Sequence, residues 1–200
     1  MSTPAQNKND RSDIGTVVTV GILVVAYILY VAVTRLSEMF SVPGSVTAPV
    51  PMPASDSTVS TGLDAAASAD TVLLSVAGVN AISTGSFVVS IALPALAYAS
   101  AALLGIRICR NLLRGDVFSP ANARITTVAS LLLAGGALVG AFFRVLGLNG
   151  MLAAAGGDFG EHTRVMLDVA PVFLAAIAIG VLPVIFRRGL ALQKETEGLV

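Results

Sequence analysis

The side chains of this sequence that could do chemistry gather in a few places, and the largest group is basic. Arg107, Arg110, Arg114 and Arg124 surround one short polar segment. The first three are spaced by three and four residues, so they share one face of a helix. An anion or nucleotide site is one interpretation, because helix starts attract negative groups. The segment lacks the glycine-rich cradle of phosphate sites, so we favour contacts of Arg107, Arg110 and Arg114 with lipid headgroups.

The second group is acidic and contains the only histidine, His162, close to Asp158 and Glu161. A zinc site needs three or four ligands, and no second cluster supplies the rest. The single Cys109 excludes an internal disulfide, and we expect an inert thiol there, with palmitoylation as the alternative. No zinc-protease or serine-histidine pattern lies in an apolar segment. We therefore expect no metal, no cofactor and no enzymatic activity.

The third group is a pair of charges near the ends of two apolar segments, Arg144 and Asp168. Both should lie near the outer membrane interface, on adjacent helices. Charges inside membrane spans are costly and often functional, but at this depth they can reach the interface or pair. We predict an Arg144–Asp168 ion pair that closes the outer end of a helical bundle.

The composition indicates that a membrane positions these groups. Hydrophobic residues make up 55% of the 200 residues and charged residues 12%, about half the share in soluble domains. The mean hydropathy is +0.85. The formal net charge is zero, which gives no support to direct binding of nucleic acid.

Four apolar segments are long enough to cross a bilayer, at about 1.5 Å of helix per residue. The predicted fold is an all-α, four-helix transmembrane bundle with both termini on one side. The predicted spans are 14–34, 86–106, 125–148 and 166–186. The segments between them are a disordered tail over 1–13, an outer loop over 35–85, a hairpin over 107–124, an outer loop over 149–165 and a polar tail over 187–200.

The outer loop over 35–85 is rich in proline and serine, which favours extended coil. Within it, the β-branched segment 71–78 predicts a short strand at the membrane surface, with Val72, Leu74 and Val76 on one face. The alternative is that 71–78 is the irregular start of the next helix.

Basic residues orient the bundle. Nine of the 12 lysines and arginines fall in the predicted tails and hairpin, and the other three, Arg35, Arg144 and Arg164, fall on the opposite side. Positive residues concentrate on the cytoplasmic side of membrane proteins. We expect a multi-pass protein of the plasma (inner) membrane whose N- and C-termini are cytoplasmic.

The hairpin over 107–124 carries local stop and start signals for helices. Gly115 suits the left-handed residue that ends a helix. Ser119 is a good N-cap, and Pro120 fits the first helical position, where its missing N–H costs nothing. Asn122 would occupy the third helical position and reach back toward the cap.

Small residues at spacings of four occur in the last two spans. Gly136 and Gly140 form one such pair, and Ala176 and Gly180 form the other. Small residues let membrane helices approach closely. We expect packing within one chain, and a homodimer is the alternative.

Two motifs of this chain resemble a bacterial family of four-span membrane proteins, domain-of-unknown-function family 2975. They are "GDVFSPANARI", with Gly115, Phe118 and Asn122, and "FRRGLALQKETEGLV", with Gly189. The resemblance covers roughly the last three spans and places both motifs at one membrane face. It implies a bacterial inner-membrane protein without an established activity. Some members of the family are encoded beside small helix-turn-helix regulators, which implies a cytoplasmic regulatory partner.

Two functions are compatible with these observations. The first is a regulatory or scaffolding membrane protein that works with a cytoplasmic DNA-binding regulator through the hairpin and the tail. The second is a subunit of a small-molecule transporter or channel. Transport sites need polar groups near mid-bilayer, and the predicted spans have no central charge, Asn or Gln, so we favour the first.

Overall fold

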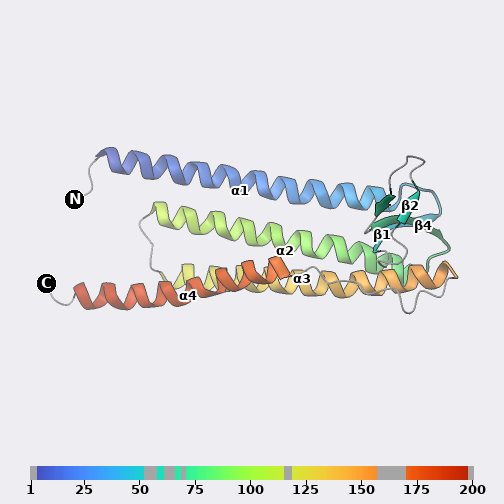
Figure 1. Cartoon of the computed structure of the whole chain (residues 1–200). Helices are drawn as coiled ribbons and strands as arrows, with labels where there is room; N and C mark the ends of the chain where they lie inside the picture. Colours follow the sequence, from blue (N-terminus) through green and yellow to red (C-terminus); the bar gives the residue numbers. More distant parts are fainter. Residues whose placement is uncertain are drawn as a thin grey trace. The chain divides into compact units, whose positions relative to one another are not determined.

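The computed structural model describes residues 4–51, 58–60, 66–68, 71–114, 119–156 and 170–197. Most of them are helical (Figure 1). The four helices are α1 (Pro4–Met39), α2 (Ala81–Leu113), α3 (Pro120–Ala154) and α4 (Ala170–Glu197). The strands are β1 (Ser45–Pro51), β2 (Thr58–Ser60), β3 (Ala66–Ser68) and β4 (Thr71–Ala77). β1 pairs with β4 and β2 pairs with β3, both antiparallel.

All four helices are long and apolar enough to cross a membrane, which agrees with a multi-pass membrane protein. The apolar stretches are Gly15–Met39, Ala81–Leu112, Pro120–Ala154 and Ala170–Gly189, with 25, 32, 35 and 20 residues. At about 1.5 Å per residue, α3 is roughly 50 Å long, well above the ~30 Å of bilayer hydrocarbon. α2 and α3 therefore extend beyond the predicted spans.

The helices also continue into segments that the sequence analysis assigned to tails and loops. α1 begins at Pro4, so residues 4–13 are helical and the predicted disordered tail is wrong for them. α4 continues to Glu197, through most of the predicted polar tail. Gln, Lys, Glu and Arg are good helix formers, and extending an existing helix costs little because each added residue gains a hydrogen bond.

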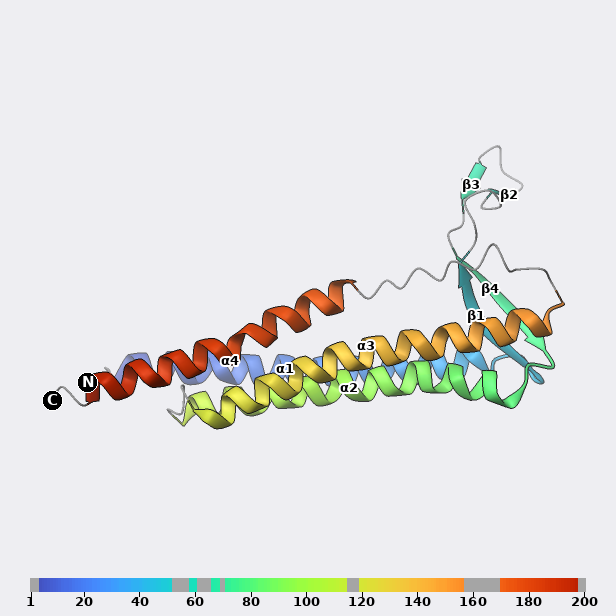
Figure 2. The same cartoon turned by 90° about the horizontal axis from the view of Figure 1, so that it is seen from below.

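The chain divides into two units. Unit 1 comprises the described parts of Met1–Val31, Leu93–Leu138 and Val169–Val200, and unit 2 comprises those of Ala32–Ala92 and Val139–Asp168. In unit 1, the start of α1, the end of α2, the start of α3 and the end of α4 lie at the same end (Figures 1 and 2). This arrangement agrees with an even number of spans.

The helices of unit 1 approach closely at small residues. A Cβ added to Gly136 of α3 would lie 2.7 Å from the Cβ of Ala97 on α2. Ser130 Oγ of α3 donates a hydrogen bond of 2.8 Å to the backbone oxygen of Ala176 on α4. A Cβ on Gly180 would lie 3.1 Å from the same hydroxyl. Gly136, Ala176 and Gly180 are therefore used for packing within the chain, as expected.

In unit 2, β1 and β4 form the strand pair of which the sequence predicted one member. The register places Thr47 opposite Ser75, and their hydroxyl oxygens lie 2.8 Å apart. Val76 is buried, and Val72 and Leu74 are half-buried on the same face, which confirms the predicted strand.

The expectation of coil for the proline-rich part of the loop is wrong for β1, which contains Pro49 and Pro51. Alternate N–H groups of an antiparallel strand point away from its partner. Two prolines separated by one residue can therefore both occupy outward positions of this edge strand without losing a ladder hydrogen bond.

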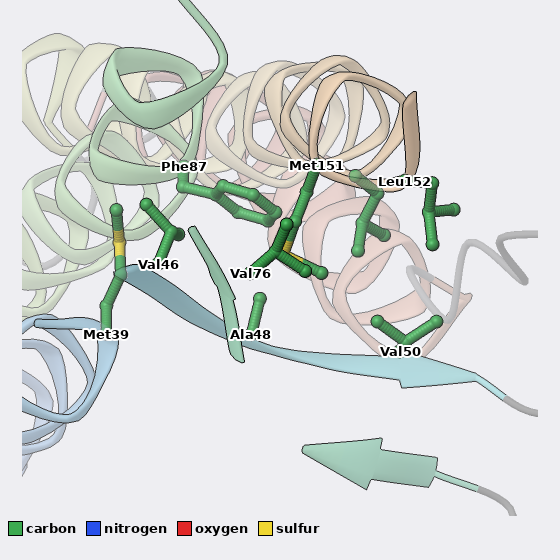
Figure 3. Packing of buried hydrophobic residues seen from close by; sticks show 9 residues of the cluster. Met39, Val46, Ala48, Val50, Val76, Phe87, Met151 and Leu152 are labelled. Atoms are coloured by element: carbon green, nitrogen blue, oxygen red, sulfur yellow. The ribbon is translucent and has the colours of Figure 1, made fainter. Parts of the chain in front are cut away.

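The β1–β4 strand pair covers the main hydrophobic core of unit 2. Figure 3 shows Val46, Ala48, Val50 and Val76 of the strands facing Phe87 of α2 and the end of α3. The core consists of Met39, Val46, Ala48, Val50, Val76, Phe87, Leu148, Met151 and Leu152. Leu148 and Met151 have no exposed surface. Because strands cover these helix ends, α2 and α3 stay ordered beyond the length that a bilayer would require.

Candidate functional site

Residues from both motifs line one small pocket of unit 1, which we call the motif pocket, and Ser119 and Pro120 are the singled-out residues among them. Its volume is about 170 Å³, and it is lined by Ser119, Pro120, Ala123 and Arg124 of α3 together with Phe186 and Arg187 of α4. The sequence analysis placed both motifs at the same membrane face, and in unit 1 they line the same cavity. Gly115 and Phe118 lie outside the described residues.

The start of α3 fixes one wall of the motif pocket. The helix begins at Pro120, and the backbone N–H of Asn122 donates a hydrogen bond of 3.2 Å to Ser119 Oγ. The N–H of Ala123 donates to the backbone oxygen of Ser119. The predicted N-cap at Ser119 and the proline at the first helical position are therefore confirmed.

Asn122 also holds α3 to the preceding helix. Its side chain is fully buried, and its Oδ1 accepts a hydrogen bond of 2.7 Å from Nδ2 of Asn111 on α2. The sequence pattern around Asn122 suggested only a cap and gave no signal for Asn111. The neighbouring Thr126 hydroxyl, also buried, bonds back to the oxygens of Asn122 and Ala123 at 3.0 Å each. The fully buried Asn122 and the half-buried Asn111 lie where little water competes for this hydrogen bond, so the bond helps to fix the spacing of α2 and α3.

The rim of the motif pocket is positively charged. Arg124 and Arg187 are both exposed, and the start of α3 adds the positive end of its dipole. Phe186 and Pro120 supply apolar surface beside these charges. The Ser119 hydroxyl is occupied by the helix cap. The arrangement suits binding of an acidic and apolar surface rather than a reaction.

The other predicted site residues do not line this pocket. Arg107, Arg110 and Arg114 are exposed near the end of α2, where headgroup contact was predicted, and Gly189 is half-buried on α4. Cys109 is half-buried and has a free thiol.

Asp168 and the group around His162 lie outside the described residues, so the predicted Arg144–Asp168 pair stays a prediction. Among the described residues, no three His, Cys, Asp or Glu side chains are grouped as a metal site would require.

Comparisons with protein families, curated proteins and solved structures find no match for this chain. The motif pocket is therefore interpreted from its own geometry.

A second and larger cavity lies in unit 2, with a volume of about 630 Å³. It contains Arg144, for which the sequence analysis predicted an ion pair, but its neighbours there are Arg35 and Glu38 of α1. The sequence analysis noted Arg35 only as one of the three basic residues on the outer side. We call this cavity the Arg35–Arg144 pocket.

Proposed function

We propose that this chain is a regulatory or scaffolding protein of the bacterial inner membrane that binds a cytoplasmic protein through the face around the motif pocket. One observation carries the proposal: two segments far apart in the sequence, 119–124 and 186–187, form one pocket with two exposed arginines on its rim. The resemblance of both segments to family motifs supports the same face.

The chemistry of the face favours a protein partner with an acidic surface. Arginine is enriched at protein interfaces because its planar group forms paired hydrogen bonds with carboxylates. Phe186 and Pro120 would be covered by the partner's apolar side chains. A cytoplasmic DNA-binding regulator held in this way would be controlled through its attachment to the membrane, and the chain itself would not contact DNA.

The proposal requires the motif pocket to face the cytoplasm, which cysteine labelling tests. With Cys109→Ser as background, we expect Asp56→Cys to react with a membrane-impermeant maleimide in cells whose outer membrane has been made permeable. Asp116→Cys should react only after lysis, because nine of the 12 basic residues lie on its predicted side. Labelling of Asp116→Cys in intact spheroplasts, with Asp56→Cys protected, would reverse the orientation and remove the proposal.

Partner binding is tested with two adjacent arginines of α4. Arg187 lines the motif pocket, whereas Arg188 is exposed and does not line it. We expect Arg187→Gln, alone or with Arg124→Gln, to weaken co-purification of the cytoplasmic partner that the wild-type chain brings down by about tenfold. Transcription of the neighbouring genes should change as it does on deletion.

Arg188→Gln is the matched control, since it removes the same charge one residue away and should leave both readouts unchanged. Equal effects of Arg187→Gln and Arg188→Gln would show that the pocket face is not the binding surface. Unchanged transcription after deletion of the whole gene would argue against a regulatory role.

A further inference from the structure

The Arg35–Arg144 pocket has the size of a small-molecule site. Its volume of about 630 Å³ lies within the usual range of ligand pockets, roughly 300–1,000 Å³. Its walls come from the end of α1, strands β1 and β4, the first part of α2 and the last part of α3. All of these segments belong to unit 2.

The charges that the described residues place around this pocket leave a positive excess. Arg35 and Arg144 both line it. Glu38, one turn after Arg35, is the single acidic residue that the described part of the chain contributes to the wall. Two like charges near each other repel, most strongly where little water screens them. A bound anion would remove this repulsion, and the arginine fork matches phosphate oxygens in geometry.

Hydroxyl groups add neutral donors to the same wall. They belong to Ser41 of the turn after α1, Thr47 of β1, whose hydroxyl is also bonded to Ser75, and Thr71 of β4. The Ser90 hydroxyl of α2 lies in the same wall but donates to the backbone oxygen of Phe87 at 2.7 Å. The oxygens of a phosphate group can accept more hydrogen bonds than two guanidinium groups donate when each binds in paired form. Hydroxyls from several elements beside two arginines therefore fit phosphate.

The rest of the wall is apolar. Phe87 and Ile91 of α2 and Leu73 of β4 line the pocket. Leu73 is 72% exposed and lies on the strand face opposite to the buried Val76. A purely polar anion would leave Leu73 and the half-buried Ile91 uncovered, whereas a ligand with an apolar part would cover them.

Counting along the helices places the pocket at a membrane boundary. The apolar run of α1 ends at Thr34, directly before Arg35, and Arg144 follows Arg124 by about 20 residues, or ~30 Å of helix. This is the thickness of the hydrocarbon layer. Arg35 and Arg144 therefore both fall at the level of the outer headgroups in the proposed orientation.

We propose that the Arg35–Arg144 pocket binds the phosphate group of an amphipathic ligand, with both guanidinium groups on the phosphate and with Phe87, Ile91 and Leu73 against the apolar part. A phospholipid headgroup and a free phosphate compound offer the same chemistry. The site is separate from the motif pocket and does not depend on the proposed partner.

The test uses the full chain in neutral maltoside micelles and two probes, dihexanoylphosphatidylglycerol and inorganic phosphate, each titrated by calorimetry. We expect Arg35→Gln and Arg144→Gln to weaken binding of the lipid probe by about tenfold or more, since each removes a charged donor. Glu38→Gln should tighten binding, because it removes the opposing carboxylate. Arg188→Gln, the same change in an exposed arginine of unit 1, should have no effect.

The two probes separate the sources of the phosphate. Binding of the lipid probe alone identifies a membrane phospholipid, and equal arginine-dependent binding of both probes identifies a free phosphate compound. The site does not exist if neither probe binds the wild-type chain, or if both arginine variants bind as tightly as wild type. Circular dichroism at 222 nm checks folding, and Glu38→Gln supplies an independent readout of opposite sign if Arg144→Gln fails to fold. The calorimetric test does not depend on co-purification of a partner or on transcription, so this proposal and the proposed function can fail separately.

Discussion

Replacement of Leu148 by alanine is expected to lower the free energy of unfolding by about 2–5 kcal/mol. Leu148 lies on α3 with no exposed surface, within the core that the β1–β4 strand pair covers (Figure 3). The substitution removes apolar contacts and leaves a cavity, because packed neighbours relax only partly. Titration with sodium dodecyl sulfate, followed by circular dichroism in maltoside micelles, measures the loss.

Leu131→Ala is the matched control, the same change on the same helix. Leu131 is 66% exposed, so it faces lipid or detergent both before and after unfolding. Its truncation should cost well under 1 kcal/mol, since lipid is as apolar as leucine. Equal losses for the two variants would mean that Leu148 does not belong to a packed core.

Replacement of Gly136 by leucine is expected to lower the free energy of unfolding by about 3 kcal/mol, because overpacking a tight contact forces backbones apart. A Cβ at this position would lie 2.7 Å from the Cβ of Ala97 and 3.7 Å from the Cα of Pro94, both on α2. Neither atom belongs to a flexible side chain that could turn away. The thermal unfolding midpoint in micelles should fall accordingly.

The neighbouring glycine provides the comparison. A Cβ on Gly135 meets nothing within 4 Å, so Gly135→Leu should leave the midpoint unchanged or raise it, since leucine is the better helix former. A lower midpoint for Gly135→Leu than for Gly136→Leu would contradict the close approach of α2 and α3 at Gly136.

The features that depend on residues close together in the sequence were predictable, because their signals are local. Runs of about 20 apolar residues fix the number and rough position of the membrane helices, since unpaired backbone groups cannot be exposed to lipid. Ser119 and Pro120 fix the start of α3, because a cap needs only its own first turn. The β-branched and apolar residues at alternate positions of 71–78 were enough to predict one face of β4.

The ends of the helices were not predictable from bilayer thickness. α3 continues past its predicted span to Ala154 because the β1–β4 strand pair helps to bury Met151 and Leu152. The sequence pattern predicts β4 but not its partner β1. Pro49 and Pro51 disfavour regular structure by themselves, and only the pairing with β4 shows that a strand can accommodate them.

The sequence by itself determined a chain of four apolar helices with an arginine-rich hairpin, because hydrophobic periodicity, length and caps act over a few turns. Only the tertiary structure decided which distant polar groups meet. It joined Asn111 to Asn122, brought Arg124 and Arg187 to one pocket, and brought Arg35 and Arg144 to the wall of another. The physical reason is that contacts between helices depend on their rotation and register, which side-chain packing across the whole chain sets.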